Sequence, residues 1–219
     1  RGTALDLVKD IDPIFLEIAE EVLKESERIF GRIDWSILFP MADHIAFAVR
    51  RIQNNDQISN PLTGDIRALF HMEYKTAECI RPILKERLHV EIDEHEVGYI
   101  ALHIHSAIED ENVALSMQIA QTVRECIRMV EEATGQTIDI MSLSYNRLMN
   151  HVRYMAARAV KGEKLKLNMN DYMSTKFPEA YELAAQVCKY LESYLRKPLD
   201  EVEIGYLAMH IERVAAQEE

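Results

Sequence analysis

The chain has 219 residues, of which 48% are apolar, and its formal net charge is −12 at pH 7. Nucleic-acid binding relies on clusters of Lys and Arg, so this acidic balance argues against direct binding of DNA or RNA. Seven glycines and six prolines are too few for a loop-rich β architecture, and no apolar run approaches the roughly 18 residues of a membrane span.

The cysteines Cys79, Cys126 and Cys188 occur singly within helical patterns. An odd number of isolated cysteines indicates a reducing compartment. We therefore expect a cytoplasmic protein without disulfides, without a zinc site and without membrane insertion.

Apolar periodicity in the first half predicts helices after a polar leader. Asp12 and Pro13 form a helix start, since Asp caps the first turn and Pro tolerates the first helical position; Gly31 ends that helix. Pro82 predicts a break in the third helix. The expected helices cover residues 13–30, 37–53, 65–87 and 94–108.

The second half repeats this plan after a polar boundary at residues 109–112. Ser144 is the expected cap of one helix, Ser174 opens a long one, and residues 161–170 form a loop. The expected helices cover residues 113–133, 144–160, 174–196 and 201 onward. No segment alternates as a strand does, so the predicted fold is all-α, with two homologous helical bundles of four or five helices in tandem.

A duplication supports this division. The stretch DEHEVGYIALHI at Asp93–Ile104 returns as DEVEIGYLAMHI at Asp200–Ile211, with eight of twelve positions identical. At the same offset along the chain, Asp43-His44 corresponds to Asn150-His151. Each copy therefore has two histidines at the same separation in sequence, His44 with His103 and His151 with His210. A mid-helix glycine in both copies, Gly98 and Gly205, predicts close approach of a neighbouring helix.

Three interpretations of the histidines stay open. A single histidine on an apolar helix face is most often a core residue with one hydrogen-bond partner. A helical metal-dependent hydrolase is disfavoured, because no HExxH spacing occurs, and His105, two residues from His103 on the other side of the helix, has no counterpart in the second copy. The third interpretation is phosphoryl acceptance, since neutral imidazole is a nucleophile and a donor protein supplies the catalytic machinery.

Several charged residues are candidate partners of a histidine or of its phosphate. Arg51 and Arg158 each lie seven residues after a histidine, on the same helix face, although solvated helix ends are the simpler interpretation of both arginines. Glu96 and Glu203 lie seven residues before His103 and His210, where they would orient those rings or raise their pKa. Asp43 precedes His44.

These motifs resemble the PTS regulation domain. The residues that carry the resemblance are DHIAFA from Asp43, GYIALH from Gly98 and their second copies, and it covers almost the whole chain. Two such domains in tandem form the regulatory part of the BglG/SacY family of transcriptional antiterminators. The stretches HIHSAIEDE and MSLSYNRLMNH are most similar to the glucose-operon branch of that family.

The resemblance implies a domain plan. Residues 1–13 would be the leader from a missing N-terminal RNA-binding domain, residues 14–108 the first regulation domain, residues 109–112 a linker, and residues 113–219 the second domain.

The resemblance also implies that the chain is a regulator without enzymatic activity and without a cofactor, phosphorylated at His44, His103, His151 and His210. The donors would be the phosphocarrier HPr and a sugar-specific enzyme II, here of the glucose type. First-domain phosphorylation would inactivate and second-domain phosphorylation would activate a homodimer, whose RNA antiterminator hairpin binds the missing domain. Asn150 departs from the pattern and puts the use of His151 in doubt. Related transcription activators carry paired domains on a DNA-binding head, and that alternative stays open.

Overall fold

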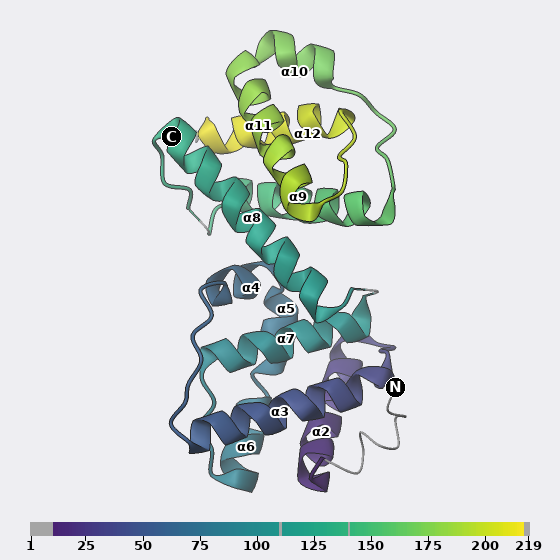
Figure 1. Ribbon diagram of the computed structural model, residues 1–219, viewed down its shortest axis with the longest axis vertical. Coiled ribbons are helices and arrows are strands. Elements are labelled where there is room, and N and C mark those ends of the chain that lie inside the picture. Colours follow the sequence, from purple (N-terminus) through teal and green to yellow (C-terminus); the bar gives the residue numbers. More distant parts are fainter. Residues whose placement is uncertain (1–10, 110, 140, 217–219) are drawn as a thin grey trace. The chain divides into compact units, whose positions relative to one another are not determined.

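The computed structural model describes residues 11–109, 111–139 and 141–216. The chain divides into two compact units, the first ending at Met117 and the second beginning at Gln118. Within the described residues every regular element is a helix (Figure 1). The predicted all-α class is therefore confirmed. Most of the expected leader, residues 1–10, lies outside the described part of the chain.

The first unit is built from short and medium helices around α7. Its elements are α2 (Pro13–Phe30), the 3₁₀ turn η1 (Trp35–Ile37), α3 (Leu38–Gln53), α4 (Thr63–Leu69), α5 (His71–Ala77), α6 (Ile80–Leu88) and α7 (Glu94–Ile108). The carboxylate of Asp12 accepts a hydrogen bond from the N–H of Ile14 at 3.1 Å and caps α2, and Gly31 ends that helix with a φ of 83°. Both boundary signals of this first helix act as expected.

The structure confirms the break expected near Cys79–Pro82, but it has three helices over residues 65–87 because a second, unexpected break occurs at Phe70. The backbone leaves the helical region at Phe70, with φ −115° and ψ 50°, and α5 ends before Cys79. Pro82 lies in the first turn of α6, where its missing N–H leaves no helical hydrogen bond unmade. The proline therefore follows a break rather than causing a kink.

The second unit contains most of α8 (Val113–Thr134) and then α9 (Leu143–Lys161), α10 (Asn170–Lys176), α11 (Pro178–Leu195) and α12 (Val202–Ala215). Two expected helix starts are wrong. Ser142, not Ser144, caps α9 by accepting the N–H of Tyr145 at 3.0 Å. Ser174 lies inside the short α10, and the long helix begins only at Pro178.

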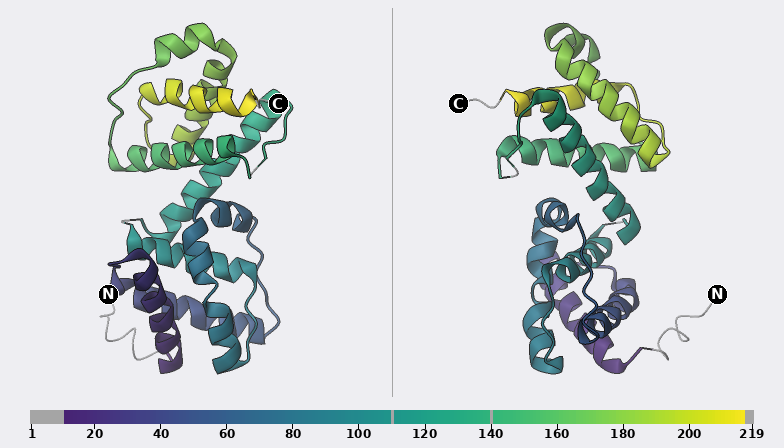
Figure 2. Two further views of the ribbon diagram at one scale, coloured as in Figure 1. Left: turned by 180° about the vertical axis from the view of Figure 1, so that it is seen from behind. Right: turned by 60° about the vertical axis from the view of Figure 1, so that its left-hand side comes forward.

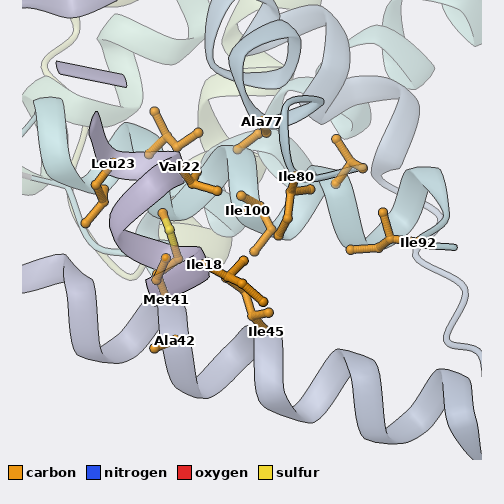
Figure 3. Packing of buried hydrophobic residues seen from close by; sticks show 14 of the residues in the cluster. Ile18, Val22, Leu23, Met41, Ala42, Ile45, Ala77, Ile80, Ile92 and Ile100 are labelled. Carbon is orange, nitrogen blue, oxygen red and sulfur yellow. The ribbon is translucent and has the colours of Figure 1, made fainter. Parts of the chain in front are cut away.

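Each unit has its duplicated stretch at its centre (Figure 2). α7 packs against α3, α4 and α5, and α12 packs against α9, α10 and α11. In the first unit the core gathers Ile18 and Val22 of α2, Ile45 of α3, Ile80 of α6 and Ile100 of α7 (Figure 3). Burying apolar side chains from these three helices against α7 stabilises the unit and fixes the rotation of α7, and with it the direction in which His103 points.

Candidate functional site

The structure brings the two histidines of each copy into ring contact. His44 of α3 and His103 of α7 have ring centroids 5.4 Å apart and planes inclined by 49°. His151 of α9 and His210 of α12 are 4.5 Å apart with planes inclined by 31°. Two positions far apart along the chain thus come into direct contact in both units. The candidate site in each unit is a pair of imidazoles on two packed helices.

A buried carboxylate lies beside the first pair. Glu96, whose side chain is 2% exposed, accepts from Nη2 of Arg51 at 2.7 Å and contacts Nε2 of His44 at 3.0 Å. Burial alone raises the pKa of Glu96, but the hydrogen bonds from His44 and Arg51 outweigh burial, and the net pKa is lowered. The carboxylate is therefore ionised at neutral pH and binds one nitrogen of His44.

The second unit keeps the arginine–glutamate pair but not the glutamate–histidine bond. Arg158 donates from Nε and Nη2 to the two carboxylate oxygens of Glu203 at 2.7 and 2.8 Å. Among the described residues, no hydrogen bond joins Glu203 to either histidine. The bidentate geometry gives each oxygen of the Glu203 carboxylate an Arg158 partner.

The expectation that Glu96 and Glu203 orient His103 and His210 is therefore wrong. In the first unit α3 and α7 run antiparallel, because His44 meets His103 while Arg51, further along α3, meets Glu96, which is earlier on α7. The glutamate two turns before His103 is thus carried towards Arg51. The two arginines are not solvated helix ends either, since the side chains of Arg51 and Arg158 are only 23% and 17% exposed.

The carboxylate of Asp43 and the amide of Asn150 do not enter the histidine contacts. Both residues are exposed. The aspartate-to-asparagine difference between the copies consequently falls on the solvent side of the helix, away from the contact between His151 and His210.

Burial keeps three of the histidines uncharged. It lowers the pKa of His103 to about 4, with a further contribution from the nearby His44. Burial also lowers the pKa of His151 to about 3 and that of His210 to about 4, helped by His210 and Arg158 beside the former and by Arg213 and Arg147 beside the latter. At neutral pH these rings are unprotonated, and each has one nitrogen lone pair able to act as a nucleophile.

Sequence reasoning missed the tyrosine that accompanies each pair. The ring of Tyr99 lies 5.2 Å from that of His44, and the ring of Tyr206 lies 6.2 Å from that of His151, nearly parallel to it. The available signal was the identity of this tyrosine in both copies of the duplicated stretch. These rings supply an apolar wall on one side of each histidine pair.

His105 belongs to a different cluster in the first unit. Its Nε2 contacts Glu111 Oε2 at 2.8 Å, and its ring lies 4.5 Å from that of Phe70. Within the described residues, no group of three or more His, Cys, Asp or Glu side chains is arranged to hold a metal ion. The described helices also include none that is long and apolar enough to span a membrane.

The comparisons with known proteins agree with this architecture. The model of the PRD domain matches the chain twice, over residues 16–107 and 124–214, so each histidine pair lies inside one match. The chain therefore belongs to the PRD domain family, as two copies in tandem.

Curated relatives of the chain are named as regulators of transcription. The chain is 31% identical over 180 residues to "Protein GlcT" of Staphylococcus haemolyticus, covering 81% of this chain and 63% of the relative. It is 29% identical over 171 residues to the "PtsGHI operon antiterminator" of Bacillus subtilis, covering 77% and 61%. It is 28% identical over 215 residues to "Transcription antiterminator LicT" of the same species, covering 96% and 78%. The aligned part thus spans less than two thirds of the first two relatives.

Proposed function

We propose that this chain is the regulatory region of a cytoplasmic transcription antiterminator of the glucose-operon type. In this proposal His44, His103, His151 and His210 accept phosphoryl groups from the sugar phosphotransferase system, with HPr and a glucose-type enzyme II as donors. The observation that carries the proposal is the contact between two imidazoles in each unit, with three of the four rings held unprotonated. Family membership and the names of the relatives support it.

Phosphoryl transfer requires only one chemical step of this chain, nucleophilic attack by a histidine ring nitrogen. A ring nitrogen forms a bond to phosphorus as the bond between phosphorus and the donor side chain breaks, and the electron pair of the broken bond returns to the donor atom. The proton on the acceptor's other ring nitrogen stays in place during the transfer. No metal or cofactor takes part on the acceptor side.

The consequence of the transfer is electrostatic. A phosphoryl group adds a charge of about −1.5 to −2 at pH 7, as it does on hydroxyl side chains. Between packed helices this charge either gains a cationic partner or repels neighbouring carboxylates, so it changes which arrangement of a homodimer is favoured. An RNA antiterminator hairpin would be bound by an N-terminal domain preceding the expected leader, residues 1–13, and not by this acidic chain.

The test is site-resolved phosphorylation. The purified chain is incubated with phosphoenolpyruvate, enzyme I and HPr, with and without a glucose-type enzyme II, and each histidine is mapped by mass spectrometry. We expect mass gains on the paired histidines, with donor-dependent differences between the units. Exposed His71 is the internal control, and a phosphate found on His71 but on none of the four paired histidines would refute the proposal.

A further inference from the structure

Two arginines that the sequence did not single out flank the second histidine pair. Arg158 and Glu203 pair on one side of His151 and His210, which fixes α9 and α12 as antiparallel. On the opposite side, Arg147 lies one turn before His151 on α9, and Arg213 lies one turn after His210 on α12. The antiparallel register carries both arginines to the same end of the pair.

These two arginines line a cavity of about 790 Å³ in the second unit. Its other charged lining residues are Asp139 and Glu212. No ion pair within the described residues involves Arg147 or Arg213, whereas Arg158 is fully engaged by Glu203. Asp139 is itself engaged as a turn former, because its carboxylate accepts the N–H of Met141 at 2.9 Å. The cavity therefore offers two guanidinium groups without an ion-pair partner. Neither histidine lines it, but both arginines lie close enough to His210 to lower the pKa of its ring.

The corresponding place in the first unit has the opposite character. At the offset that relates His44 to His151, Pro40 and Ser106 stand where the second unit has Arg147 and Arg213. They line a cavity of about 660 Å³ that His103 also lines, and its charged lining residues are acidic. Those residues are Asp34, Glu109 and Glu111. Two sites built on the same histidine pairing thus face surroundings of different charge.

We propose that Arg147 and Arg213 form a binding site for the phosphoryl group carried by His210. A phosphoryl dianion is the ligand that two converging guanidinium groups bind best, through short charge-assisted hydrogen bonds. His210 is the acceptor because Arg213 follows it by one turn and because its Nδ1 is buried without a hydrogen-bond partner, which leaves Nε2 for the phosphorus. The lowering of the pKa of His210, caused first by burial and then by Arg213 and Arg147, agrees with their closeness to its ring.

The inference rests on the proposed function, and it adds whether a phosphoryl group strengthens or weakens helix packing in each unit. Phosphate on His210 gains two cationic partners and ties α9 to α12 more firmly. Phosphate on His103 meets three carboxylates, and the repulsion between these negative charges weakens the packing of α7. Opposite effects of phosphorylation in the two units would then follow from four positions, Pro40, Ser106, Arg147 and Arg213.

The test compares the lifetime of phosphohistidine in matched variants. Potassium phosphoramidate, a small-molecule donor that needs no partner protein, phosphorylates the wild-type chain, the variant Arg147→Gln/Arg213→Gln and a control. The control, Lys176→Gln/Lys189→Gln, removes the same two charges from exposed positions of the second unit. Loss of the phosphoryl group from His210 is followed by site-resolved mass spectrometry, and thermal unfolding verifies that the unphosphorylated variants remain folded.

We expect the half-life on His210 to shorten about tenfold in the arginine variant, the loss that corresponds to one hydrogen bond between charged groups. In the lysine control, and on His103 in every variant, the half-life should not change. Equal half-lives on His210 in the arginine variant and the control would overturn the inference, and so would a wild-type His210 that phosphoramidate does not modify. A normal arginine effect with phosphoramidate, together with no transfer from HPr or enzyme II, would instead overturn the proposed function alone.

Discussion

The histidines were identified from the sequence, but their partners were not. Duplication at a fixed offset singled out His44, His103, His151 and His210, because four equivalent positions retain one residue type in copies that differ widely elsewhere. Spacing along one helix gave the wrong partner for Glu96, since the antiparallel register of α3 on α7 is set by packing between residues far apart in sequence. Local spacing predicts a shared face, whereas the residue across the interface depends on tertiary packing.

Glu96 and Glu203 differ in their hydrogen-bond partners, and this difference also depends on individual residues. A buried carboxylate must have its charge compensated, and removing one partner of a buried pair leaves an unpaired charge at high cost. Arg158 alone compensates Glu203 through two bonds, whereas Glu96 divides its oxygens between Arg51 and His44. In the first unit, therefore, any change at His44 also disturbs the charge balance of the core.

Acidification tests the buried, neutral histidines. The folded chain holds the pKa of His103 at about 4 and that of His151 at about 3, whereas an unfolded chain has the ordinary value of about 6.5. Between these values the unfolded state binds more protons, so the free energy of unfolding falls as the pH falls. The lowered pKa of Glu96 acts in the same direction at still lower pH. We expect a loss of about 2 kcal/mol per buried histidine between about pH 7 and pH 5.

Urea unfolding of the unphosphorylated chain at the two pH values measures this loss. In the variant His103→Gln the pH-dependent loss should shrink by the share of one histidine, while substitution of the exposed His71 by Gln should leave it unchanged. Identical unfolding free energies at both pH values in the wild-type chain would show that the rings are not held neutral by burial.

At the scale of the helices, the sequence predicted the two ends of α2 correctly, but the equivalent helix breaks in the two units were missed. Asp12 with Gly31 delimits α2 as predicted. The breaks at Phe70 and Phe177 occupy equivalent positions, and both backbones leave the helical region there. In the second copy Pro178 predicts the break at Phe177, since a residue before proline avoids the helical conformation. Carrying that signal across the offset between the two copies would have placed the break at Phe70 as well.

The two mid-helix glycines, which the sequence treats alike, differ in the structure. A Cβ added at Gly205 would lie 2.9 Å from the backbone N of Asn170 and 2.9 Å from the backbone carbonyl carbon of Met169. One added at Gly98 would meet only the methyl groups of Ile66 and Thr63, at 3.9 and 4.0 Å. The predicted close approach therefore holds for α12 against the start of α10, and it is wrong for α7.

Substituting each glycine by alanine separates these cases. Gly98→Ala should stabilise the chain by up to about 1 kcal/mol, because alanine favours the helix and fits the space. Gly205→Ala should destabilise it by about 1–3 kcal/mol, since the Asn170 backbone must shift and its bond from the Gly205 N–H is strained. Denaturant midpoints of the two variants measure the difference, and equal shifts in one direction would contradict the contact geometry.

At the scale of the whole chain, the duplication predicted two similar bundles, but it did not predict that the charge around the histidine pairs differs between them. Charge at a cavity depends on which side chains the fold brings to it. Most residues that line the cavity at His103 and the cavity at Arg147 and Arg213 come from segments that the duplicated motifs do not include. The same histidine pairing was therefore reused in two electrostatic settings. Sequence reasoning found the repeated part, and the part that distinguishes the units required the tertiary structure.

Because each unit has its own core, a core substitution in one unit should destabilise that unit and not the other. Ile100 of α7 and Leu207 of α12 occupy equivalent positions, and both are fully buried. The core around Ile100 is formed by residues of the first unit alone. Truncating either side chain to alanine should cost about 2–5 kcal/mol through lost burial and an unfilled cavity, and the cost should fall on the unit that contains it.

Hydrogen exchange followed by mass spectrometry resolves the two units as separate peptides. In Ile100→Ala, peptides from α2, α3 and α7 should exchange faster while those from α9, α11 and α12 keep the wild-type rates, and Leu207→Ala should give the reverse pattern. Because the two substitutions are matched in position and burial, each serves as the control for the other. If either one accelerated exchange equally in both sets of peptides, the units would unfold as one cooperative body. A phosphoryl group on one histidine pair would then destabilise or stabilise the whole chain, and not its own unit first.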